Sequence, residues 1–239
     1  MTRILRFGRA GVLPLLMIGL FVILLLLLIP LLALGLAGAA FTKLGFSWPE
    51  AVAVIVLMAV GYFIDIPVWA IRCPPVSDSF TGSTVFDAFT GEPVNTKLYS
   101  TRVFLNIGGA ILPVTVSGYL FYESPPAIAV HLIISTGVCL TAVALVVALF
   151  TRVLPGQGIS VPLVLPTLAA VACSVLANGA TGLEASVTAF SGGTLGILLG
   201  AGLAALYRGK QNSIPQISIG GAGMFGSVFL CALIAALIA

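Results

Sequence analysis

Residues 127–150 read AIAVHLIISTGVCLTAVALVVALF, and this stretch decides the class of fold. It contains no Asp, Glu, Lys or Arg, and as a helix it would exceed the roughly 30 Å of a bilayer's hydrocarbon core. The whole chain of 239 residues is 60% hydrophobic and 7% charged, whereas soluble domains are about 25% charged. Such a chain cannot cover a water-facing surface, so we predict an integral membrane protein.

Further apolar stretches of similar length lie on both sides of this one. None shows the alternating pattern of a membrane barrel, so only helices can span here. We therefore predict an all-α bundle of about seven transmembrane helices that forms a single domain over residues 1–239. The predicted spans are 12–36, 50–71, 103–122, 127–150, 160–180, 186–207 and 216–238.

The basic residues predict how the spans are oriented. With the N-terminus inside, nine of the 10 Lys and Arg residues face the cytoplasm and only Lys43 lies outside. The apolar run after Arg9 is far longer than the core of a signal peptide, so we interpret it as a retained anchor helix. This predicts a multi-pass protein with a cytoplasmic N-terminus and an external C-terminus.

One cytoplasmic loop, residues 73–101, differs from the other connections. It alternates apolar and polar residues and contains two Phe-Thr-Gly copies, at 80–82 and 89–91. We expect a short β-hairpin against the membrane face, with a plain connector as the alternative.

Several classes of function are not indicated by the sequence. The basic residues are scattered singly, so no nucleic-acid surface is predicted. His131 has no second ligand at a suitable spacing and the four cysteines form no C-x-x-C pair, so we predict neither a metal site nor a cofactor. No nucleophile, zinc-protease or phosphate-loop motif occurs, so no catalytic residue is assigned.

Two polar residues stand out inside the predicted spans. Asp65 lies in Gly61-Tyr62-Phe63-Ile64-Asp65-Ile66-Pro67, and an ionisable residue within a span is a functional candidate. The alternative is that Asp65 reaches the cytoplasmic interface or pairs with Arg72 or Arg102. Asn106 lies at a similar predicted depth, so the two residues form a candidate intramembrane polar site.

Glycines mark the last two predicted spans. Small residues recur at every fourth position of the sixth span, which predicts close helix packing, either within the bundle or between copies. The seventh span opens with four glycines in seven residues, which favours either a broken helix or a smooth helix packed on the sixth. The helix-packing candidates are Gly192, Gly196, Gly200, Ala204, Gly220, Gly221, Gly223 and Gly226.

Four short motifs resemble an uncharacterised prokaryotic membrane-protein family, a domain of unknown function. They are Tyr62–Pro67, Asn106–Pro113, Gly193–Gly196 with Gly200-Ala201, and Ile219–Gly223 with Phe225. The resemblance implies a cell inner membrane location. It also implies an aspartate in the sixth and another in the seventh span, where this chain has Gly202 and Gly226. A pair of such aspartates is typical of intramembrane aspartyl proteases, and its absence implies that any such chemistry is lost.

Of three functional hypotheses, we favour a non-catalytic accessory or assembly subunit of a larger membrane complex, whose partners are the lipid bilayer and other membrane proteins or further copies of itself. The second is a small-solute or ion transporter that uses Asp65. The third is a degenerate protein similar to intramembrane aspartyl proteases.

Overall fold

The computed structural model describes residues 34–35, 37–38, 41–42, 44–72, 100–154, 158–211 and 216–238. This part of the chain is mostly helical, which confirms the helical class. Its long helices are α2 (Trp48–Gly61), α3 (Leu112–Glu123), α4 (Pro126–Phe150), α5 (Leu165–Asn178), α6 (Leu183–Gln211) and α7 (Phe225–Ile238). Most of the predicted first span and residues 73–99 of the predicted hairpin lie outside the described residues.

Helix α6 is the centre of the bundle and packs against α3, α4, α5 and α7. Its glycines allow the closest of these contacts. A Cβ atom added at Gly192 would lie 2.7 Å from the Cβ of Cys139, and one added at Gly196 would lie 2.8 Å from the Cβ of Val143. Because only a hydrogen occupies these positions, the α4 and α6 backbones can approach closely.

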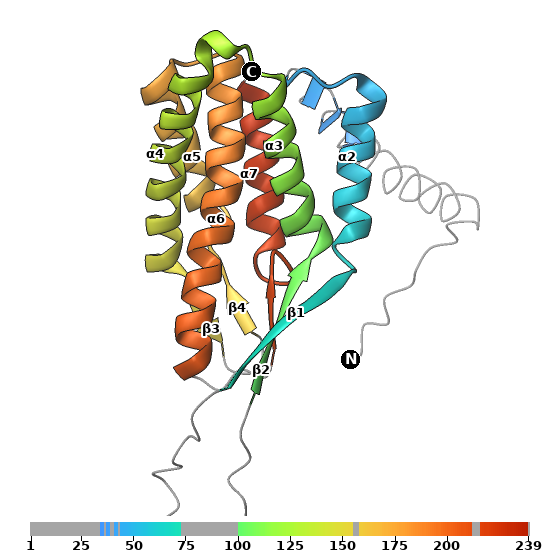
Figure 1. The fold of residues 1–239 in the computed structure, drawn as a ribbon, viewed down its shortest axis with the longest axis vertical. Coiled ribbons are helices and arrows are strands. Elements are labelled where there is room, and N and C mark those ends of the chain that lie inside the picture. Colours follow the sequence, from blue (N-terminus) through green and yellow to red (C-terminus); the bar gives the residue numbers. More distant parts are fainter. Residues whose placement is uncertain are drawn as a thin grey trace, which may run out of the picture.

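Five strands lie at the lower end of the helices in Figure 1. The strands β1 (Asp65–Arg72), β2 (Ser100–Asn106) and β5 (Gln216–Ile219) form a sheet in the order β1-β2-β5, and a hairpin joins β3 (Arg152–Leu154) to β4 (Gly158–Ser160). β1 pairs antiparallel with β2, and β2 pairs parallel with β5. In the chain, β1 follows α2, whereas β2 precedes α3 and β5 precedes α7. The sheet therefore brings together three segments that are distant in the sequence.

The prediction of single helical spans over 50–71 and 103–122 was therefore wrong, and of the two alternatives for 216–238 the structure has the broken one. Each of these stretches is a shorter helix joined to a strand, and the helix predicted over 160–180 extends only from Leu165 to Asn178. Pro67 cannot donate the backbone hydrogen bond that would continue α2. Gly220 and Gly223 have φ angles of +79° and +88°, which separate β5 from α7.

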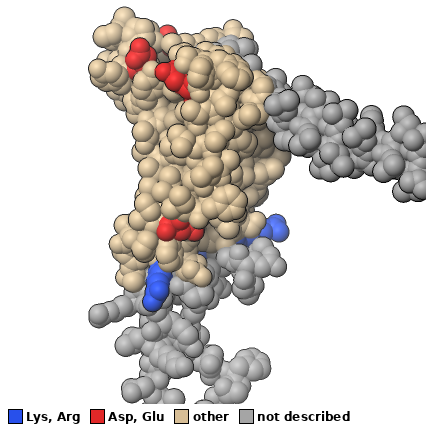
Figure 2. Space-filling model, turned by 90° about the vertical axis from the view of Figure 1, so that its right-hand side faces the viewer, with Lys and Arg blue, Asp and Glu red and all other residues tan. Residues whose placement is uncertain are grey.

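Two helices in the described part, α4 and α6, are long and apolar enough to cross a membrane. Charged side chains lie mainly at the two ends of the molecule in Figure 2. Glu123 and Glu184 lie at the end where α3 stops and α6 starts, whereas Arg152 and Arg208 lie at the opposite end. A wide band without Lys, Arg, Asp or Glu on its visible surface separates them (Figure 2).

Candidate functional site

A polar cluster forms where α2, α3 and α7 give way to the sheet. The strand register places Asp65 directly opposite Asn106. On the other side of β2, Ser218 of β5 is paired with Phe104, two residues from Asn106. We call Asp65, Asn106 and Ser218 the junction cluster, because each lies within a few residues of a helix–strand junction.

Asn106 is the buried hub of the junction cluster, with no exposed surface. Its Nδ2 donates to the carbonyl oxygen of Tyr62 at 2.7 Å and to Oδ1 of Asp65 at 3.0 Å. Its Oδ1 accepts from the backbone N–H of Gly109 at 2.8 Å, which caps the π-helix η1 (Ile107–Ile111) at the start of α3. One amide therefore ties the end of α2 to the beginning of α3.

Asp65 completes the link to β5. Its Oδ1 accepts a hydrogen bond from the Ser218 hydroxyl at 2.6 Å as well as the one from Asn106. No hydrogen bond from the described residues reaches Oδ2, and Asp65 is exposed. The carboxylate thus has one oxygen fixed by the protein and one available to a ligand.

Glycines let the backbones around the cluster approach closely. A Cβ atom at Gly108 would overlap the carbonyl oxygen of Met58, and one at Gly109 would overlap that of Gly220. At Gly221, an added Cβ would collide with Ser218 Oγ and lie 3.4 Å from Asp65 Oδ1. The glycines at these three junctions therefore position the polar side chains by removing bulk between backbones.

No ion pair neutralises Asp65 within the described part of the chain. The predicted alternative partner Arg102 is opposite Ala70, four residues along β2 from Asn106 and roughly 13 Å away. Arg72 was the other alternative partner, and its side chain is not among those that the structure describes. The structure thus brings Asp65 and Asn106 into contact, where the sequence had indicated only a similar depth, and adds Ser218, which the sequence interpretation missed.

The other candidate residues lie elsewhere. Gly192 and Gly196 lie along α4, as described, and Gly200 has Ala144 of α4 beside it. Ala204 is buried in α6, whereas Gly223 and Gly226 are exposed around the start of α7. Gly202 is buried in α6, so the two positions where the resemblance implies aspartates differ in exposure.

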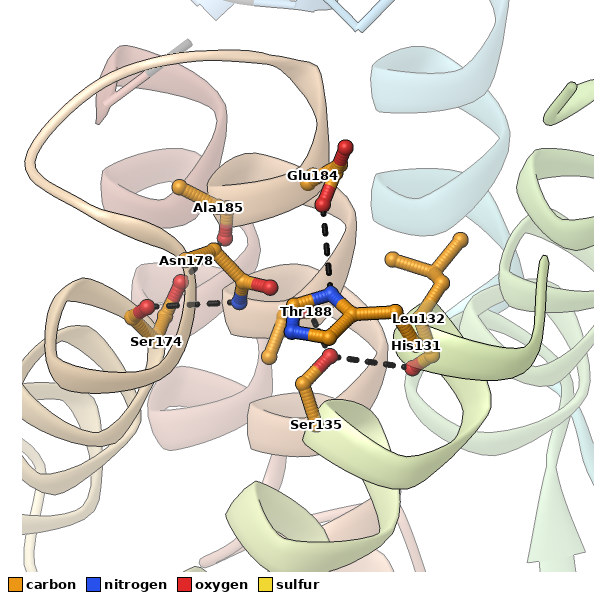
Figure 3. A network of polar contacts seen from close by, with 8 residues as sticks. All are labelled: His131, Leu132, Ser135, Ser174, Asn178, Glu184, Ala185 and Thr188. Atoms are coloured by element: carbon orange, nitrogen blue, oxygen red, sulfur yellow. Dashed lines mark hydrogen bonds and ion pairs between the residues drawn. The ribbon is translucent and has the colours of Figure 1, made fainter. Parts of the chain in front are cut away.

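His131 lies at the end of the molecule opposite the strands. Its Nδ1 is 3.3 Å from Glu184 Oε2, and Figure 3 shows the two side chains pointing toward each other from α4 and α6. Beneath this pair the hydroxyls of Ser135 and Thr188 lie 3.0 Å apart (Figure 3). No group of three or more His, Cys, Asp or Glu side chains suited to a metal occurs among the described residues. These contacts connect helices rather than form a ligand site.

The family model described as "Protein of unknown function (DUF1614)" matches residues 59–238. The chain belongs to this family. The DUF1614 match includes all three residues of the junction cluster and the glycines around it, so the cluster lies within the part of the chain that defines the family. No curated protein and no solved structure matches the chain.

Proposed function

We propose that the chain is a multi-pass protein of the cell inner membrane. The length of α4 and α6 supports this, because each exceeds about 36 Å, enough to cross a bilayer of roughly 30 Å. The band without charged side chains supports it too, as do the large exposed apolar residues on the outer face of α4, such as Val130, Ile133 and Leu145.

Within that membrane, we propose transport of a small solute or ion through the junction cluster. The observation that carries this proposal is that three apolar segments change between helix and strand at one place, next to α2, α3 and α7. The exposed carboxylate of Asp65 lies at that place. Discontinuous helices of this kind expose backbone and polar groups to a substrate in many transporters. If the segments served only to pack the helices, Asp65 would not need an oxygen, Oδ2, that no described residue donates to.

Flux measurements in proteoliposomes test this proposal. Purified protein is reconstituted, and the entry of protons, sodium and potassium is compared between wild type, Asp65→Asn and Glu123→Gln. Asparagine keeps an oxygen that can accept from Asn106 and Ser218 but loses the charge, so flux should fall at least about tenfold while the fold is retained. Glu123 lies at the opposite end of the molecule, so its variant should match wild type.

Equal flux in wild type and Asp65→Asn would remove Asp65 from the transport path. Absence of any protein-dependent flux of these three ions would contradict ion transport and leave an uncharged solute as the cargo to be assayed.

A second candidate function is an accessory subunit of a larger membrane complex. The observation that favours it is β1, which forms an edge of the sheet and exposes Ile66, Val68 and Trp69. An open sheet edge in an apolar environment leaves backbone groups without partners, which a strand of a partner subunit would satisfy. Extraction in mild detergent followed by mass spectrometry tests this: partners in a fixed ratio support a subunit, and an isolated chain contradicts it.

A further inference from the structure

We propose that the junction cluster binds a small monovalent metal cation, with sodium as the probe. This deepens the proposed transport function by naming its ligand, and it can be tested by binding alone.

The side-chain donors of the cluster are all engaged within it. The amide of Asn106 has two N–H groups, which lie toward the carbonyl oxygens of Tyr62 and Ile64 and toward Asp65 Oδ1, at 2.7, 3.4 and 3.0 Å. The single O–H of Ser218 is donated to Asp65. No side chain of the cluster retains a hydrogen to offer an anion or a carbonyl group.

What remains available is a set of oxygen lone pairs. Asp65 Oδ2 accepts nothing from the described residues, and Ser218 Oγ retains acceptor capacity after donating its hydrogen. Of the three residues between α2 and β1, Tyr62 and Ile64 have carbonyl oxygens that already accept hydrogen bonds, whereas the carbonyl of Phe63 accepts none from the described residues. Hard cations prefer such oxygen ligands, and carbonyls of unwound helix ends commonly hold sodium in transporters.

The charge of the cluster selects a monovalent ion. Asp65 is its one carboxylate, and an aspartate contributes a single negative charge at neutral pH. Sites for calcium gain their affinity from several carboxylates, and magnesium retains a shell of water with one or two carboxylates. One carboxylate with neutral oxygens balances one positive charge and leaves no excess.

The cluster is fixed on one side and open on the other. Asn106 is fully buried and holds Asp65 Oδ1 in place, whereas Asp65 itself is exposed. A cation can therefore reach Oδ2 without a change in the packed core.

Equilibrium binding of radioactive sodium to the full-length protein in detergent tests the inference, with scintillation proximity as the readout. Wild type should show saturable binding that unlabelled sodium displaces. Asp65→Asn should lower the affinity at least about tenfold, and Ser218→Ala should lower it by a smaller factor of about threefold. Glu123→Gln, which removes a carboxylate outside the cluster, should bind as wild type does.

Thermal unfolding of each variant shows whether it remains folded, and a folded Asp65→Asn without binding supports the proposal. Absence of saturable binding to folded wild type would overturn it, as would equal binding by Asp65→Asn. Saturable sodium binding without any flux in proteoliposomes would uphold the cation site and contradict transport. Flux of another solute without sodium binding would uphold transport and contradict the cation site.

Discussion

Asn106 shows how much of this fold depends on one side chain. It has no exposed surface and connects Tyr62, Asp65 and Gly109 through its amide. Replacement by leucine keeps the volume but leaves the buried N–H of Gly109 without its acceptor, which costs about 1–3 kcal/mol, and also removes the hydrogen bond to the half-buried Tyr62 carbonyl. We therefore expect Asn106→Leu to lower the thermal unfolding midpoint markedly in detergent.

The matched control for that variant is Asn178→Leu. Asn178 is only partly buried, and its Nδ2 makes a single hydrogen bond of 3.3 Å to the Ser174 carbonyl within α5. Its loss should cost much less. Equal destabilisation by the two variants would show that Asn106 is an ordinary interior asparagine and not the hub of the junction.

Gly109 gives a steric prediction at the same junction. A methyl group there would overlap the Gly220 carbonyl oxygen, whereas one at Gly118 of α3 would meet nothing within 4 Å. Gly109→Ala should therefore destabilise the protein by about 1–3 kcal/mol or more, because the backbones of η1 and the β5–α7 turn must separate. Gly118→Ala should be neutral or stabilising by up to about 1 kcal/mol. Unfolding midpoints in one detergent compare the two, and a stable Gly109→Ala would contradict the close approach.

Sequence reasoning found part of the cluster for a physical reason. Asp65 is a carboxylate inside an apolar segment, and Asn106 is an amide near the start of the apolar segment 103–122, so both are conspicuous against their neighbours. Ser218 is a small residue among many serines, and only the parallel pairing of β2 with β5 shows that it meets Asp65. Asp65 and Ser218 are 153 positions apart in the sequence, so no local sequence pattern could have predicted their contact.

At the scale of elements, the sequence predicted helices over segments that are partly strands in the structure. A buried run of Ile, Val and Phe is compatible with either a helix or a strand, and length favoured helices. Pro67 and the glycines at 108–109 and 220–223 were signals of a break, yet glycine and proline also occur within transmembrane helices. The strands form because three such breaks lie side by side and can pair, and this depends on tertiary structure that the local sequence does not show.

Arg208 connects two elements at the lower end of the bundle. From α6 its guanidinium donates to the carbonyl oxygens of Thr151 and, at 3.1 Å, Ala148, which are among the last of α4. A cation there satisfies carbonyls that have no helical partner and opposes the negative end of the helix dipole. Arg208→Gln should cost about 1–2 kcal/mol of stability.

Arg152 provides the control for that prediction, because it is exposed and only one residue beyond Thr151. Arg152→Gln should leave the unfolding midpoint in detergent almost unchanged. If both variants lost the same stability, net charge at this end of the molecule would explain the effect and a specific cap on α4 would not.

At the scale of the whole molecule, the distribution of charge and the packing of α4 and α6 both bear on the proposed bilayer location. Most residues of the apolar part of α6 are buried, whereas only about a third of those of α4 are, so α6 is a core helix and α4 presents its outer side to the surroundings. Its exposed residues are mostly apolar from Val130 to Phe150, with His131 and Thr141 as the polar exceptions. A water-soluble protein would place polar residues there, so the proposed bilayer location follows from α4 more strongly than from α6.

Crossing by α4 can be tested directly with a residue just outside each of its ends. Glu123 and Arg152 are both exposed, and α4 between them has 25 residues, about 37 Å of helix. In sealed cells, a membrane-impermeant maleimide should label Glu123→Cys and should label Arg152→Cys only after permeabilisation. Wild type, with its four native cysteines, supplies the background. Labelling of both variants from the same side would show that α4 does not cross the membrane, and labelling of Arg152→Cys alone in sealed cells would reverse the predicted orientation.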